Sequence, residues 1–123
     1  MKLRIKDQSI RFRLSQNEVQ KLEAVGEIVA ITYLGESALT YMIKHSLDLL
    51  FSCTFLEGEI SVTVPQEILQ TWCNSDQITI EGKVQKSEQS PSLQILIEKD
   101  FQCLLERAGE DESDLYPNPQ AQP

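Results

Sequence analysis

The start of the chain alternates between apolar and polar side chains. The alternation runs through residues 2–6, breaks at Asp7-Gln8, and resumes through residues 9–14. Because successive side chains of a β-strand point to opposite faces, a period of two predicts two strands joined by a turn. The apolar residues of both strands then share one face of a hairpin, and the polar residues share the other.

A short helix and a second hairpin are predicted next. Ser15 and Glu18 have the spacing of a capping box, which begins a helix, and Gly26 is placed to end it. Residues 28–33 and 38–43 are apolar-rich runs separated by a Gly-Glu-Ser turn, a pattern typical of two paired strands.

The same order of elements recurs later in the chain. Strands are predicted at 53–55, 60–64, 77–84 and 93–98, and Pro65 suits the first turn of a second short helix. A shift of 50 residues aligns 5–31 with 55–81 without a gap, and apolar positions and helix starts then coincide. We therefore expect an internal duplication, with repeats at about 3–46 and 53–100.

One repeat of this size is too small to bury its own sheet face. Two repeats complete each other when their strands close, or nearly close, around a common interior. The predicted fold is therefore α+β and mainly β: a barrel-like sheet from two β-β-α-β-β repeats, with two short helices. Its predicted core includes Ile5, Phe12, Phe55, Trp72 and Ile78.

The length of 123 residues fits one such domain, which we place at 1–109. Residues 110–123 form an acidic, proline-rich tail, whose composition predicts a flexible, solvated segment. Leu115-Tyr116-Pro117 is the exception, because it gives the tail a point at which it can dock onto the domain or onto a partner.

Charge narrows the range of partners. The chain has 19 acidic and 11 basic residues, which give a net charge of −8 and a sequence pI near 4.6. The long-range field of such a protein repels phosphates, so nonspecific binding to nucleic acid or to an anionic membrane is disfavoured.

Basic residues are nevertheless concentrated in the first hairpin. Its polar face carries a set of cations that we call the basic hairpin face: Lys2, Arg4, Lys6, Arg11 and Arg13. Cross-strand spacing brings some of them within about 5–8 Å of one another, where like charges repel. Three sources of compensation are open: the acidic tail, an external anion or acidic partner, and surface pairing with Glu57, Glu59 and Glu81.

Candidate chemistry is otherwise sparse. Cys53, Cys73 and Cys103 form no C-x-x-C pair, so the sequence indicates neither a structural zinc site nor a redox pair. The single histidine, His45, lies beside no residue in a known nucleophile context. We therefore predict no catalytic residues, no metal ligands and no cofactor.

Parts of the sequence resemble two known protein families. The start Met1-Lys-Leu-Arg-Ile-Lys, the Arg-Leu-Ser-Gln segment at 13–16 and the acidic end at 110–119 resemble a family of short uncharacterised bacterial proteins. The stretch 61–72, followed by Ser-Asp-Gln-Ile-Thr-Ile, looks like the core of AbrB-type swapped-hairpin proteins, and residues 5–32 fit the same frame more loosely. This second resemblance implies a two-repeat intertwined barrel in which Arg4, Arg11 and Arg13 contact DNA.

The expected function is a non-catalytic binding or protein-interaction module that presents the basic hairpin face to an unknown protein or anionic ligand. Two alternatives are an AbrB-like DNA-binding regulator, which pools basic hairpins in a dimer, and a small-molecule enzyme or binder with a cavity in the barrel. The chain starts without an apolar signal region, and nothing approaches the roughly 18 apolar residues of a membrane span. We expect a cytoplasmic monomer or homodimer.

Overall fold

A computed structural model describes residues 1–102 and 111–121, and its elements follow the predicted order. The first repeat contains β1 (Lys2–Lys6), β2 (Ser9–Leu14), α1 (Gln16–Val25), β3 (Glu27–Leu34) and β4 (Ser37–Ser46). The second contains β5 (Ser52–Leu56), β6 (Glu59–Pro65), α2 (Gln66–Cys73), β7 (Thr79–Val84) and β8 (Leu93–Lys99). A 3-10 turn, η1, spans Pro119–Ala121. The fold class is therefore α+β and mainly β, as predicted.

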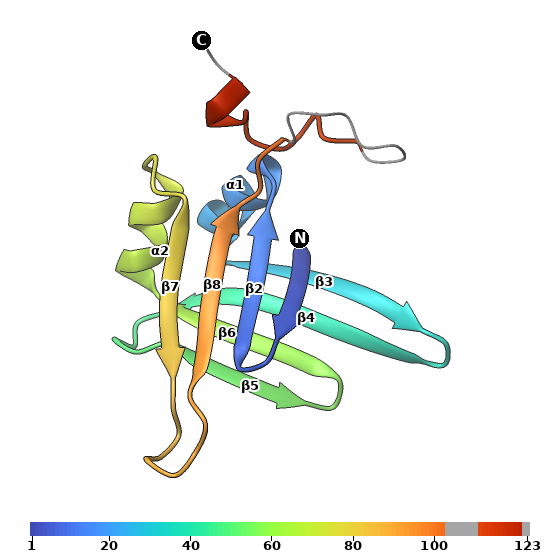
Figure 1. The fold of residues 1–123 in the computed structure, drawn as a ribbon, viewed down its shortest axis with the longest axis vertical. Coiled ribbons are helices and arrows are strands. Elements are labelled where there is room, and N and C mark those ends of the chain that lie inside the picture. Colours follow the sequence, from blue (N-terminus) through green and yellow to red (C-terminus); the bar gives the residue numbers. More distant parts are fainter. Residues whose placement is uncertain (103–110, 122–123) are drawn as a thin grey trace.

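The strands form two sheets by an exchange of hairpins. Sheet A has the order β1-β2-β8-β7, and sheet B has the order β3-β4-β6-β5. The central pair of each sheet is parallel, and it joins a hairpin of one repeat to a hairpin of the other. The strands of the two sheets cross steeply (Figure 1). The helices contact each other, and α2 also contacts strands of both sheets.

The apolar faces of the sheets meet in a common core. Its fully buried side chains include Phe12, Val62, Ile97 and Trp72, and the indole Nε1–H of Trp72 donates to the carbonyl of Ile78 at 2.8 Å. The space between the sheets is therefore a packed interior. Among the described residues, no helix is long and apolar enough to cross a membrane.

The predicted closure into a barrel is wrong. β1 and β7 are the edges of sheet A, β3 and β5 are the edges of sheet B, and no strand pair joins the sheets within the described residues. Each sheet is complete once two hairpins have paired through their inner strands. Ile5 and Phe55 lie on the edge strands β1 and β5, which a closed barrel would cover, and they are 61% and 71% exposed.

The pairing of the strands corrects the alignment of the repeats. The first hairpins pair equivalently at an offset of 50 residues, and their turn residues Asp7 and Glu57 have nearly equal φ angles of 49° and 51°. After the helices, Ile80 rather than Ile78 takes the place of Ile28. The connection that follows α2 is longer than the single residue, Gly26, that follows α1. The ungapped alignment therefore fails beyond the helices, and Ile78 is partly exposed instead of buried.

The described part of the tail, residues 111–121, lies against the domain. Leu115 is buried, and the amide of Gln16 at the start of α1 donates to the carbonyl of Asp114 at 3.0 Å. The amide of Tyr116 donates to the carbonyl of Asp100 at 2.8 Å. Leu115-Tyr116-Pro117, for which docking onto the domain or onto a partner was expected as the exception to a solvated tail, lies against the domain.

Candidate anion-binding site

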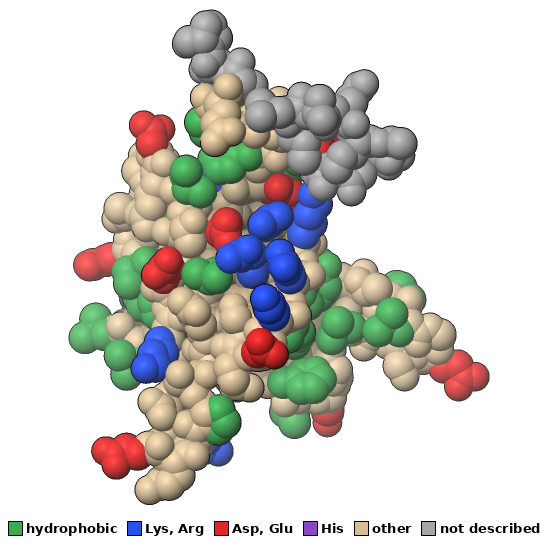
Figure 2. All heavy atoms as spheres, viewed as in Figure 1, with side chains coloured by type: hydrophobic (Ala, Val, Ile, Leu, Met, Phe, Trp, Pro, Cys, Tyr) green, Lys and Arg blue, Asp and Glu red, His purple; other side chains and the backbone are tan. Residues whose placement is uncertain are grey.

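The basic hairpin face lies on the outer side of sheet A. Alternation along β1 and β2 places their apolar residues on the inner side of sheet A and their basic residues on the outer side. The antiparallel register sets Lys2 opposite Arg13 and Arg4 opposite Arg11. Figure 2 shows the resulting group of basic side chains over these strands. The predicted site residues are thus brought together on one surface.

Two members of this face have acidic partners. Lys2 Nζ lies 3.0 Å from Asp100 Oδ2, and Arg11 Nε lies 2.6 Å from Glu98 Oε1. Both carboxylates come from the end of β8 and the residue after it, because β8 is the parallel neighbour of β2. The sequence did not identify Asp100 and Glu98 as partners of the basic residues, since nothing local connects these carboxylates with the first hairpin.

Pairing with Glu57, Glu59 and Glu81, one of the three sources of compensation left open, is not seen in residues 1–102 and 111–121. Glu57 and Glu59 lie at the β5–β6 turn of sheet B, and Glu81 lies on β7, two strands away from β2. Hairpin exchange explains this outcome, because it places β8 next to β2.

The remaining members of the face have no ion-pair partner within the described residues. Arg4, Lys6 and Arg13 make no ion pair there, and Arg4 and Lys6 are exposed to solvent. Arg4 also lies directly opposite Arg11, so their like charges are held close together by the register. The carboxylate of Glu98 offsets part of this repulsion through its ion pair with Arg11, and an anion bound beside Arg4 would offset more of it.

An open depression of about 440 Å³ lies at this position. Its lining combines the cations of Arg4, Lys6 and Arg11 with neutral hydrogen-bonding groups and one acid: Gln8, Ser9, Gln94 and Asp7. A second depression of about 360 Å³ adjoins it and shares Gln94. Guanidinium and ammonium groups together with amide and hydroxyl donors can bind a carboxylate or a phosphate oxygen.

The second repeat does not reproduce this face. At the offset of 50 residues, the counterparts of Arg4, Arg11 and Arg13 are neutral: Thr54, Ser61 and Thr63. The basic hairpin face therefore has no counterpart on β5 and β6, and a site built from it is present once per chain.

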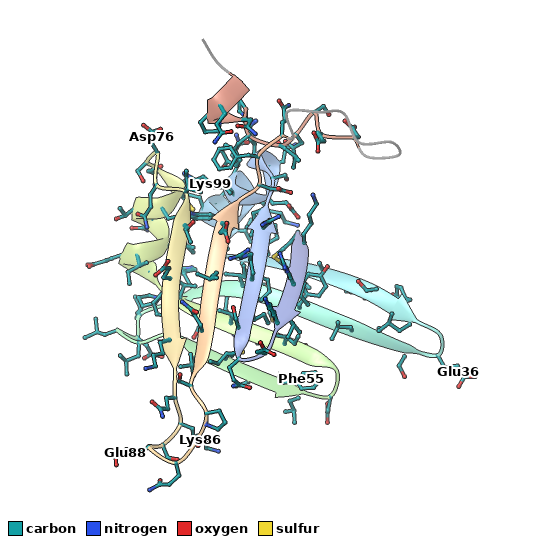
Figure 3. All side chains as sticks on the ribbon, in the orientation of Figure 1. Glu36, Phe55, Asp76, Lys86, Glu88 and Lys99 are labelled. Atoms are coloured by element: carbon teal, nitrogen blue, oxygen red, sulfur yellow. The ribbon has the colours of Figure 1, made fainter. Side chains whose placement is uncertain are left out.

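A second polar cluster surrounds Lys99, near the top of β8 in Figure 3. Lys99 is buried, its ammonium donates to the carbonyl of Ser75 at 2.6 Å, and it lies 5.5 Å from the centre of the Trp72 ring and 5.8 Å from that of Tyr116. Burial lowers the pKa of Lys99. Its hydrogen bond and ring contacts join β8 to the end of α2 and to the docked tail.

The described cysteines have little thiolate character. Burial, followed by the charge of Glu23, raises the pKa of the Cys73 thiol to about 11, and burial also raises the pKa of Cys53. A thiol with a raised pKa is a poor nucleophile near neutral pH. Cys103 lies outside the described residues.

Comparison with known proteins places the chain in a family. The chain belongs to DUF7009, a family of unknown function whose model matches residues 1–120. No curated protein and no solved structure matches the chain.

Proposed function

We propose that this member of DUF7009 is a non-catalytic interaction module that binds an acidic segment of a partner protein on its basic hairpin face. One observation carries the proposal: Arg4 and Lys6 are exposed and without ion-pair partners among the described residues, and they line a depression with Arg11. A carboxylate at this position gains charge-assisted hydrogen bonds and relieves the repulsion between neighbouring cations.

The choice of a protein segment rests on charge and shape. The chain has a net charge of −8, so a long polyanion meets repulsion everywhere except on this face. A short acidic segment can occupy the depression lined by Arg4, Lys6 and Arg11 and leave the acidic surface elsewhere uncovered. Cys53 and Cys73 are free thiols, which supports a reducing compartment such as the cytoplasm as the place where the module acts.

The test is an isothermal titration calorimetry experiment in which a short poly-glutamate peptide is added to the full chain at low salt. We expect binding that weakens as salt is added, because the interaction is electrostatic. Arg4→Thr copies the counterpart residue of the second repeat, Thr54, and should weaken binding about tenfold by removing a charge-assisted contact. Lys44→Ser removes the same charge from the outer side of sheet B and is the matched control.

The outcomes separate the alternatives. Absence of peptide binding at low salt, or equal losses from Arg4→Thr and Lys44→Ser, contradicts the proposal. Binding of inorganic phosphate with the same loss in Arg4→Thr, without binding of the peptide, indicates a small anionic ligand. Retardation of duplex DNA that is lost in Arg4→Thr supports the AbrB-like regulator, in which two copies pool their single basic hairpins.

A further inference from the structure

The start of α1 is a binding site for a peptide segment of the same chain. The backbone amide of Gln16 donates to the carbonyl of Asp114 at 3.0 Å, and its side-chain amide donates to the carbonyl of Leu115 at 3.0 Å. The next amide of the helix, that of Asn17, donates to Oδ1 of Asp114 at 3.3 Å. Leu115 is buried. The first turn of α1 thus holds an extended segment by its backbone, by a capping carboxylate and by one leucine.

The second repeat has the same backbone arrangement around the start of α2. The parallel pairs of the two sheets are in equivalent registers, because Leu14 lies opposite Lys99 in sheet A and Val64 lies opposite His45 in sheet B. Ser46, which follows His45 at the end of β4, therefore corresponds to the residue after β8 that pairs with the tail. A peptide site at the start of α2 would lie between that helix and the chain that leaves β4.

An open depression of about 390 Å³ lies at this position. It is lined by the start of α2 and by the connection from β4 to β5, which runs beside that helix (Figure 1). Its apolar side chains include Leu47, Leu49 and Ile68, which are 88%, 89% and 39% exposed. The first amides of a helix have no partner within it, and Pro65 gives α2 no side-chain cap. The depression therefore offers backbone donors beside apolar side chains, as the start of α1 does.

Two side chains of the depression can serve a bound peptide. Gln66 is the counterpart of Gln16 at the offset of 50 residues, so the side-chain amide that donates to the tail is present in both repeats. The hydroxyl oxygen of Ser46 is buried and has no hydrogen-bond partner among the described residues. Buried polar atoms are usually bonded, and a peptide backbone can supply this partner once the serine side chain turns toward it.

We propose that this depression binds an extended segment of a partner protein that carries a leucine and no acidic residue. The extended form and the leucine follow from the segment that the equivalent site holds at α1. The exclusion of acids follows from the lining, because Asp48 and Glu67 are negatively charged, whereas their counterparts in the first repeat are neutral. A capping aspartate such as Asp114 is repelled here, and asparagine can accept the same hydrogen bonds without the charge.

NMR spectroscopy of the full chain tests the proposal with a defined peptide. The peptide is Ser-Asn-Leu-Tyr-Pro-Asn, which copies residues 113–118 with asparagine in place of Asp114. We expect it to shift the amide signals of Glu67 and Ile68 at the start of α2. The amide signal of Gln16 should stay in place, because the tail already occupies the start of α1.

Variants of the depression locate the contacts. Gln66→Ala should weaken binding about fivefold, because it removes one hydrogen bond to the peptide. Leu49→Ser should also weaken binding by removing apolar lining. Leu34→Ser is the matched control, because Leu34 is an exposed leucine on β3 outside the depression, and this variant should bind as the wild-type chain does. Circular dichroism confirms that all three variants are folded.

The natural tail peptide, which keeps the aspartate, separates the two possible occupants. We expect it to bind more weakly than the asparagine peptide, because Asp48 and Glu67 repel it. Tighter binding of the natural peptide would assign the depression to the tail of a second copy and overturn the choice of a neutral partner. Unchanged signals at the start of α2, shifts at α1 alone, or equal losses from Leu49→Ser and Leu34→Ser overturn the site itself.

Discussion

Gly26 marks the residue at which the first repeat changes from helix to strand. It ends α1 with a φ of +90°, a left-handed conformation that side chains with a Cβ rarely adopt. The imidazole ring of His45 lies against the Cα of Gly26. The His45 amide donates to the Gly26 carbonyl at 3.1 Å. A Cβ at this position would overlap the imidazole ring.

Gly26→Ala should therefore lower the free energy of unfolding by about 2 kcal/mol or more, from backbone strain together with displacement of His45. Gly35→Ala is the control, because Gly35 has a φ of +68° but open space around its Cα. Gly35→Ala should lower the free energy of unfolding by only about 1 kcal/mol, the cost of the left-handed conformation alone. Urea unfolding followed by circular dichroism measures both, and equal losses contradict a role for the His45 contact.

The sequence shows the helix end at Gly26 but not the residue that covers it. A glycine after the last helical turn is a local signal. His45 reaches it from β4, and that contact exists only once β3 and β4 have paired. The ion pairs from Lys2 to Asp100 and from Arg11 to Glu98 were missed for the same reason, since β2 meets β8 only in the folded chain.

At the scale of elements, α1 is held at its start by two sets of bonds. Ser15 and Glu18 form the predicted capping box, with both of its reciprocal bonds. The tail adds a second set, in which the amides of Gln16 and Asn17 donate to the backbone and side chain of Asp114. Burial of Leu115 holds the tail in this position.

Leu115→Ser should release the tail and leave α1 folded, because its own capping box remains. We expect the amide protons of Gln16 and Gln102, which donate to Asp114 and Tyr116, to exchange with solvent about tenfold faster or more. Hydrogen exchange followed by NMR measures this. Ser113→Ala changes an exposed neighbour and should leave these rates unaltered. Loss of the whole helix in Leu115→Ser argues against independent capping.

The strands that alternate clearly in the sequence, such as residues 2–6 and 9–14, were predictable because a period of two is visible locally. The register after α2 was not, since a shift of two residues leaves every side chain on the same face. Hydrophobic pattern alone therefore does not distinguish Ile78 from Ile80 as the counterpart of Ile28. The prediction of a closed barrel was wrong for a related reason, because periodicity does not determine which strands become the edges of a sheet.

At the scale of the whole molecule, each repeat depends on the other. Peptides of residues 1–50 and 51–123 should each be unfolded alone, because β1–β2 and β5–β6 both lack the hairpin that completes their sheet. Mixing them should restore β-structure. Circular dichroism and the fluorescence of Trp72, which is fully buried in the folded chain, report the change. Cooperative unfolding of either peptide alone contradicts this dependence.

The parallel pair of β2 and β8 joins the two ends of the polypeptide, with Ser9 opposite Gln94. During translation, the first hairpin is made before β8, its neighbour in the sheet, and all the other strands are made between them. Synthesis at about 5–20 residues per second leaves Ile10 and Phe12 uncovered for several seconds. The nascent chain therefore has to stay free of aggregation throughout this interval, and folding is completed only after β8 has emerged from the exit tunnel.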